Sequence, residues 1–227
     1  MPADQAAGLR RRSACQPVRC LHCFFDAGLS STRLAQALHQ MGQASLLIDM
    51  QGRLFASAAT RSLFTPGQQL ERGELHTLPQ AYGDGWYAPG IRTDAPHLRT
   101  AAQGYDCVVF DAGWGGEGLA PWPDAFHGAV VEIRASQESM LRSYAVLKTL
   151  CHAYGPPNIA LLGDAAACDH VRAACSRFLE PSFARAVHSV AHEEDAFAAL
   201  AIRMVGETSG ERHPAARTVR GNGPESW

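Results

Sequence analysis

The chain alternates between short continuous apolar runs and segments with helical periodicity. The apolar runs are residues 18–25 (VRCLHCFF), 46–49 (LLID), 107–111 (CVVFD), 129–133 (AVVEI) and 158–163 (NIALLG). A continuous apolar run of this length is typical of a parallel strand that is buried on both faces. We therefore predict five buried strands.

Between and after these runs, apolar residues recur at the i, i+3, i+4, i+7 spacing that predicts helices. Ser30 or Ser31 can cap the first helix, and Gly42 lies where this helix should end. Further helices are expected over residues 136–153, after the capping residue Asp164, and over residues 192–205. Strands that alternate with helices predict an α/β fold, a three-layer sandwich in which helices cover both faces of a mainly parallel sheet.

The same pattern predicts one domain with two appendages. Residues 1–17 are expected to form an N-terminal arm, residues 18–206 the α/β domain, and residues 207–227 a disordered tail without apolar periodicity. Residues 51–104 contain many glycines and prolines and only weak periodicity, so we assign no elements there.

Composition excludes several classes of function. A hydrophobic fraction of 46% with 19% charged residues is that of a globular protein, and the net charge of −2 favours no nucleic-acid partner. No apolar run is long enough to span a membrane, and the N-terminus lacks a signal peptide, so we expect a cytoplasmic protein with reduced cysteines. Lys148 is the only lysine among the 20 Lys and Arg residues.

The first candidate site is the loop of residues 26–32 (DAGLSST), between the first strand and the first helix. Ligands of parallel sheets bind at the carboxyl ends of strands, and a phosphate would meet free N–H groups and the helix dipole there. A working P-loop also needs a lysine, which this loop lacks. A plain turn between strand and helix stays open as the alternative.

Two other motifs give weaker evidence for a binding site. Residues 113–118 (GWGGEG) match the dinucleotide pattern, but Pro121 and Pro123 argue against the helix that this pattern requires. Residues 20–23 (CLHC) have no second cysteine pair at zinc-site spacing, so we interpret them as part of a buried strand with its cysteines on opposite faces.

Two segments resemble the MinD/ParA family of P-loop ATPases. Residues 34–49 (LAQALHQMGQASLLID) are similar to the family's first helix, glycine turn and second strand, and residues 105–115 (YDCVVFDAGWG) to its switch segment. The resemblance is weak over residues 51–104. It implies a P-loop NTPase fold with remnants of a nucleotide site at Gly28, Ser30, Ser31, Thr32, Asp49, Asp111 and Gly113.

The N-terminal arm resembles one branch of this family, the FlhG (FleN, YlxH) regulators of flagellar number. Residues 4–10 read DQAAGLR, similar to the DQAxxLR element that starts FlhG proteins and is implied to bind and stimulate the GTPase FlhF. Such a segment can become ordered as a short helix on its partner. The implied partner-binding residues are Asp4, Gln5, Ala6, Leu9 and Arg10. An unstructured basic arm is the alternative.

The chain departs from the family at the residues that handle phosphate. The family's KGGxGKT loop has two lysines, and this loop has none. Family members also carry a second aspartate two residues after the aspartate that ends the second strand, and here that position, two residues after Asp49, is Gln51. Loss of the lysine removes several kcal/mol of transition-state stabilisation, so we expect no hydrolysis, no catalytic residue and no dedicated metal site. No cofactor is expected to be obligatory, although weak binding of ATP or ADP with Mg²⁺ stays open.

These observations predict a regulator of flagellar number or placement that binds an FlhF-type GTPase and other flagellar proteins. The tail after Gly206 shows no amphipathic helix, so ATP-driven membrane cycling is not expected. A homodimer and recruitment to the cell pole by partners stay open. The alternatives are a residual ATPase of the same family and a degenerate MinD-like accessory protein of another system, such as cellulose secretion.

Overall fold

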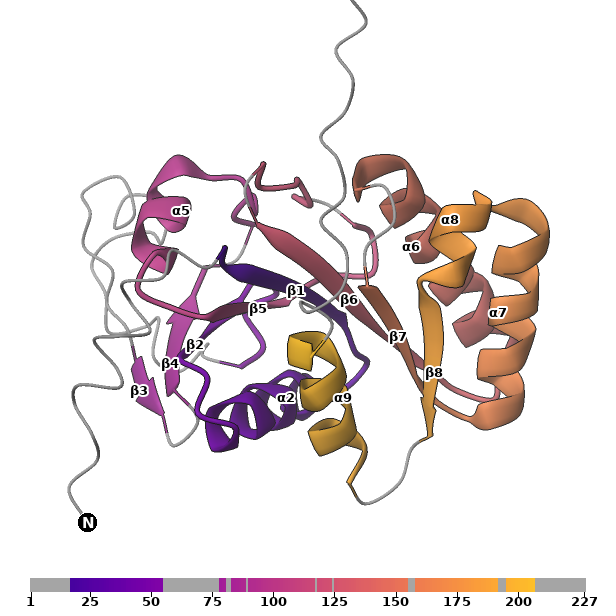
Figure 1. The fold of residues 1–227 in the computed structure, drawn as a ribbon, viewed down its shortest axis with the longest axis horizontal. Helices are drawn as coiled ribbons and strands as arrows, with labels where there is room; N and C mark the ends of the chain where they lie inside the picture. The colour runs from indigo at the N-terminus through magenta and orange to yellow at the C-terminus, as the bar shows by residue number, and fades with distance from the viewer. Residues whose placement is uncertain are drawn as a thin grey trace, which may run out of the picture.

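The computed structural model describes residues 17–54, 78–80, 83–88, 90–116, 118–123, 125–154, 158–191 and 195–206. Its strands form one sheet in the order β3-β4-β2-β5-β1-β6-β7-β8 (Figure 1). Among the described strands, only β3 runs antiparallel to its neighbour, β4, and the other neighbouring strands are parallel. The strands are β1 (Arg19–Phe24), β2 (Ser45–Asp49), β3 (Leu78–Gln80), β4 (Gly83–Tyr87), β5 (Cys107–Asp111), β6 (Phe126–Ile133), β7 (Asn158–Gly163) and β8 (Val187–Ala191).

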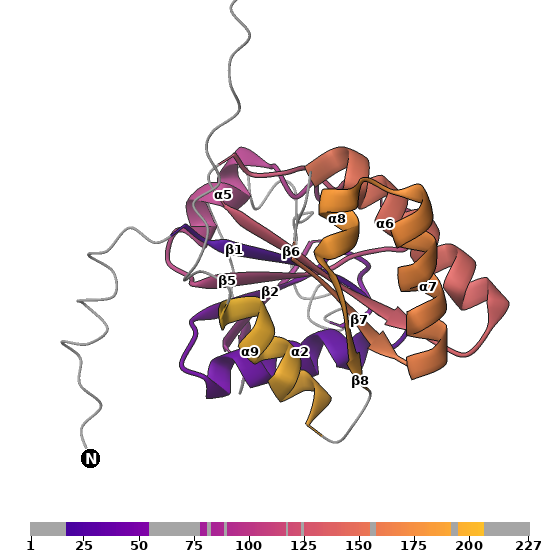
Figure 2. The ribbon, with the colours of Figure 1, turned by 45° about the vertical axis from the view of Figure 1, so that its right-hand side comes forward.

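Helices cover both faces of this sheet. The two helices α2 and α9 pack side by side on one face, and the other helices lie on the opposite face (Figures 1 and 2). The helices are α2 (Gly28–Gln40), α5 (Pro96–Ala102), α6 (Gln137–Tyr154), α7 (Ala165–Phe178), α8 (Pro181–Arg185) and α9 (Ala196–Gly206). The predicted three-layer α/β fold with a mainly parallel sheet is confirmed.

The core is divided into two apolar clusters by the sheet. Strand β1 shows why: Cys20 and Phe24 pack in one cluster, and Leu21 and Cys23 pack in the other. Successive residues of a strand point to opposite faces, so a strand in the middle of the sheet must be apolar along its whole length. The interpretation of residues 20–23 as buried strand, with the two cysteines on opposite faces, is confirmed.

The parallel register brings acidic residues to one edge of the sheet. Strands β2 and β5 pair so that Asp49 lies opposite Asp111, and Cys23 of β1 lies on the other side of Asp111. Both carboxylates are fully buried. This edge, at the carboxyl ends of three central strands, is where ligands of such sheets bind.

The predicted cap of the first helix is wrong. Helix α2 begins at Gly28, and the N-cap residue Ala27 makes no side-chain hydrogen bond to the helix. At its other end Met41 is the C-cap and Gly42 follows in the left-handed region, with a φ of 77°. The N–H of Gly42 donates to the carbonyl of His39, which is typical of glycine-terminated helices.

The structure confirms some of the remaining predictions about helices and strands and differs from others. Asp164 caps α7 as expected, since its carboxylate accepts the N–H of Ala167 at 2.9 Å. Leu141 of α6 is an apolar residue that lies 63% exposed. No helix follows residues 113–118 among the described residues that precede β6, which agrees with the rejection of a dinucleotide site. The apolar pattern of the sequence did not predict the short elements β3, β4, β8, α5 and α8.

Several predictions lie outside the described residues. These are the partner-binding element at residues 4–10, the tail at residues 207–227 and the expected helix start at residues 192–194. None of the helices that the structure describes is both long and apolar enough to cross a membrane.

Candidate functional site

The loop between β1 and α2 is held by protein groups. The N–H of Asp26 donates to Oε2 of Glu132, at 2.8 Å, and the N–H of Ser30 donates to the carbonyl of Ala27, at 3.1 Å. In a phosphate-binding loop such N–H groups face the ligand. Here the N–H at the start of the loop is already bound to a carboxylate.

Asp111, at the end of β5, is the centre of the site. Its side chain is fully buried, and three side chains of the described residues donate to it. The Ser31 hydroxyl donates to Oδ1 at 2.6 Å, and Arg53 donates from Nη2 to Oδ1 at 2.6 Å and from Nε to Oδ2 at 2.7 Å. The Gln51 amide lies 3.5 Å from Oδ2. Ser31 therefore serves Asp111 instead of capping its helix.

Arg53 connects Asp111 to the end of β1. Besides its two bonds to the carboxylate, its guanidinium donates from Nη1 to the carbonyl of Asp26 at 3.1 Å and from Nη2 to the carbonyl of Phe25 at 3.0 Å. The hydrogen bonds to Asp111 and the nearby charges of Asp49 and Asp26 raise the pKa of the guanidinium. The positive charge at this edge of the sheet is thus supplied by the chain itself.

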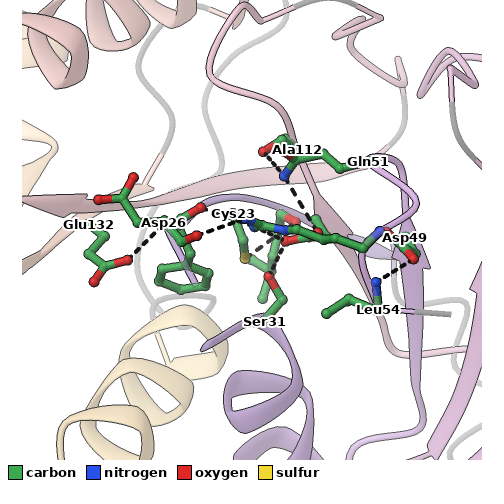
Figure 3. A network of polar contacts seen from close by, with 12 residues as sticks. Cys23, Asp26, Ser31, Asp49, Gln51, Leu54, Ala112 and Glu132 are labelled. Atoms are coloured by element: carbon green, nitrogen blue, oxygen red, sulfur yellow. Dashed lines mark hydrogen bonds and ion pairs between the residues drawn. The ribbon is translucent and has the colours of Figure 1, made fainter. Parts of the chain in front are cut away.

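Asp49 positions Arg53 through its backbone. The carboxylate of Asp49 accepts the N–H of Arg53 at 3.1 Å and the N–H of Leu54 at 2.7 Å, which folds the turn after β2 back over the strand ends. The Gln51 amide donates to the carbonyl of Ala112 at 2.9 Å and ties this turn to β5. Figure 3 shows Ser31, Asp49, Gln51 and Ala112 in this network.

A second group of charges surrounds Asp26 at the other end of the network, where Figure 3 shows Asp26 beside Glu132. The Asp26 carboxylate forms ion pairs with Arg142 at 2.6 Å and with Arg134 at 2.9 Å. The Arg142 guanidinium lies over the ring of Trp114, 4.0 Å from its centroid. The Asp26 carboxylate is thus shared by both arginines, the groups that could otherwise attract a phosphate.

The arrangement does not fit the magnesium and nucleotide that the family resemblance implies. In P-loop NTPases the metal is held by a serine or threonine of the loop and by an aspartate at a strand end. Here both oxygens of that aspartate, Asp111, accept from Arg53. A Cβ atom on Gly28 would lie only 2.7 Å from Leu54 Cδ2, so the turn after β2 covers the loop. No group of three or more His, Cys, Asp or Glu side chains within the described ranges could hold a metal.

The structure brings together part of the predicted site. Ser31, Asp49 and Asp111 share one network, and Gly28 and Gly113 border it through Leu54 and Gln51. Of the described hydrogen bonds in this network, none involves the hydroxyl of Ser30 or Thr32, which share one turn of α2.

Arg53 was missed by the sequence analysis. The only sequence feature that points to Arg53 is its position, four residues after the strand-end aspartate Asp49. The single lysine of the chain, Lys148, lies exposed on α6. The signal from position is weak, because the partner of Arg53 is 58 residues away in the sequence.

Comparisons with known proteins identify no family for this chain. No family model matches it, and no curated protein sequence matches it. Among the solved structures that resemble it is the MinD cell division protein of Aquifex aeolicus, with 14% sequence identity and a TM-score of 0.49 over 88% of this chain and 100% of that one. A likeness this distant carries no conclusion about activity or partners.

Proposed function

We propose that this chain is a non-hydrolysing regulator of the MinD/ParA type, related to the FlhG regulators of flagellar number and placement. It acts by binding and stimulating an FlhF-type GTPase. The observation that carries the proposal is the Arg53 guanidinium on Asp111, because it fills the strand-end site with a protein side chain.

The charge arrangement argues against phosphoryl transfer. Catalysis of that reaction depends on cations that lie beside the phosphates and neutralise the charge that develops on them. Arg53 directs its described hydrogen bonds to Asp111 and to two backbone carbonyls, and Arg142 is paired with Asp26. Each of these guanidinium groups is engaged by a protein acceptor, which supports a role in structure.

The partner is proposed from the N-terminal element. Residues 4–10 (DQAAGLR) resemble the element through which FlhG proteins are implied to act on FlhF. A short segment with one large apolar residue, Leu9, is too small to form a stable helix alone and can gain order in the groove of a partner. Under this proposal the α/β domain is the platform that carries the segment.

The test is GTP hydrolysis by the FlhF-type GTPase of the same organism, measured with and without the full-length chain. We expect stimulation by the wild type and its loss in the variant Gln5→Ala/Leu9→Asp, because both the polar and the apolar contact are removed. The matched control is Gln16→Ala, which changes a residue of the same arm outside the element and should stimulate like the wild type. Equal rates with and without the wild-type chain, for a GTPase shown to be active, would contradict the proposal.

A further inference from the structure

Two buried carboxylates need a positive charge at the carboxyl edge of the sheet. Asp49 and Asp111 lie opposite each other in register on β2 and β5, and both side chains are fully buried. Burying a charge is strongly unfavourable unless an opposite charge and hydrogen bonds compensate for it. The Arg53 guanidinium is the group that pairs with Asp111 there.

The acceptors around this guanidinium are all oxygen atoms, and they come from separate parts of the chain. Both carboxylate oxygens of Asp111 at the end of β5 accept from it, as do the carbonyl oxygens of Phe25 and Asp26 after β1. The Ser31 hydroxyl of α2 also contacts Asp111. Oxygen atoms of carboxylates, carbonyls and hydroxyls are the ligands that hard divalent cations prefer. The Arg53 guanidinium therefore lies among oxygen atoms of the kind that bind a divalent cation.

We propose that Arg53 is a tethered cation that stands in place of a divalent metal ion, and that removal of its charge opens a metal site centred on Asp111. The inference concerns the site behind the proposed function, but it requires no protein partner. If the metal-binding experiment below fails, the proposed stimulation of the GTPase is still tested independently by the GTP hydrolysis assay.

The position of the turn after β2 supports a tethered cation. Asp49 accepts two backbone N–H groups of this turn, from Arg53 and Leu54, so the turn has an anchor that does not involve the guanidinium. The arginine stem packs on the loop, since a Cβ on Gly28 would lie 3.5 Å from Arg53 Cγ and Cδ. Methionine at position 53 retains most of this stem without its charge, which makes Arg53→Met the suitable variant.

The experiment uses Mn²⁺ as the probe and the full-length protein. Free Mn²⁺ is followed by electron paramagnetic resonance during titration with wild type, Arg53→Met and Arg53→Met/Asp111→Asn. We expect Arg53→Met to bind one Mn²⁺ per chain with a dissociation constant of roughly 10⁻⁴–10⁻³ M, the weak end for oxygen-ligand sites. We expect the wild type to bind at least tenfold more weakly, and the double variant to lose the site.

Two results would overturn the inference. One is Mn²⁺ binding of equal strength by the wild type and Arg53→Met, which would show that the guanidinium does not occupy a metal position. The other is no binding by a folded Arg53→Met. If that variant is unfolded without metal, Mn²⁺ should restore its far-UV circular dichroism and that of Arg53→Gln, and failure to restore either would also overturn the inference.

Discussion

Arg53 reaches Asp111 through hydrogen bonds of 2.6 and 2.7 Å, and its own side chain is 25% exposed while that of Asp111 is fully buried. Such a pair is neutral as a unit, but either member alone would be a charge in an apolar environment. At the scale of single residues, this pair determines the electrostatics of the site. The buried histidine at position 22 is the second residue whose charge state matters for the fold.

The substitution Arg53→Ala is expected to lower the free energy of unfolding by about 3–5 kcal/mol, because it leaves the buried carboxylate of Asp111 without its counter-charge. The measurement is urea denaturation near neutral pH. The matched control is Arg92→Ala, which breaks the exposed pair with Asp94 and should change stability by about 0–1 kcal/mol. Equal effects of the two substitutions would show that the buried pair is not a stabilising element.

The second residue-scale prediction concerns pH. His22 is buried between Phe110 and His127, with ring centroids 5.1 and 5.8 Å away. Burial, and next the charge of His127, lower the pKa of His22 to about 3. The unfolded state therefore binds a proton below about pH 6.5 that the folded state does not bind, so stability is lost as pH falls from about 6.5 toward 3.

Between pH 7 and pH 5 this linkage amounts to about 2 kcal/mol for one histidine. The variant His22→Leu places an apolar side chain that does not titrate in the core. Its free energy of unfolding should fall by about 2 kcal/mol less than that of the wild type between pH 7 and pH 5. Urea denaturation at several pH values measures it. Identical pH slopes for wild type and variant would contradict the buried neutral state of His22.

At the scale of elements, the end of β7 constrains the backbone most tightly. Gly163 lies opposite Ile133 of β6 and has a φ of 146°, a conformation that side-chain-bearing residues rarely adopt. A Cβ atom at this position would overlap the carbonyl oxygen of Ile133. This carbonyl belongs to the last residue of β6 and accepts the N–H of Asp164 at 3.1 Å, so its displacement would break that hydrogen bond.

We therefore expect Gly163→Ala to destabilise the protein by about 1–3 kcal/mol or more, through forced displacement of the backbone. Thermal unfolding followed by circular dichroism measures this change. Gly104→Ala is the matched control, since a Cβ atom there meets nothing within 4 Å, and its effect should stay within about 0.5 kcal/mol. A neutral Gly163→Ala would mean that β6 and β7 separate more easily than their pairing indicates.

Elements with a strong local signal were predictable, and elements without one were not. The strand at residues 107–111 and the strand at 158–163 were predicted with their observed bounds, because continuous apolar runs mark buried strands. Strand β4 contains two glycines within GDGWY, and β3 contains a proline, so both resemble loops. Helix α8 has only five residues, which is too short for a periodicity to be visible.

The candidate site divides in the same way. The proximity of Ser31, Asp49 and Asp111 could be predicted, because they lie at or after strand ends that meet at one edge. Arg53 could not, because its contact with Asp111 depends on how the turn after β2 folds over the sheet, and no local pattern encodes that path. The predicted helix cap failed for a related reason, since the hydroxyl of Ser31 is used by Asp111.

At the scale of the whole molecule, the sheet order places the charged network between the two apolar clusters and at the ends of its central strands. Such a position is used by ligand-binding α/β proteins for their substrates. In this chain the position is filled by Arg53, with Asp26 and Asp49 holding the surrounding loops. The place where such proteins bind a ligand is therefore occupied in this chain by its own side chains.

Closure of the strand-end site by Arg53 is tested most simply by steady-state ATP hydrolysis with the purified full-length chain in the presence of Mg²⁺. We expect a rate that does not exceed the rate without protein and that does not change in the variant Asp111→Asn, provided that the variant is folded. A rate above that background which falls in Asp111→Asn would instead show that Asp111 serves a nucleotide and that Arg53 does not close the site.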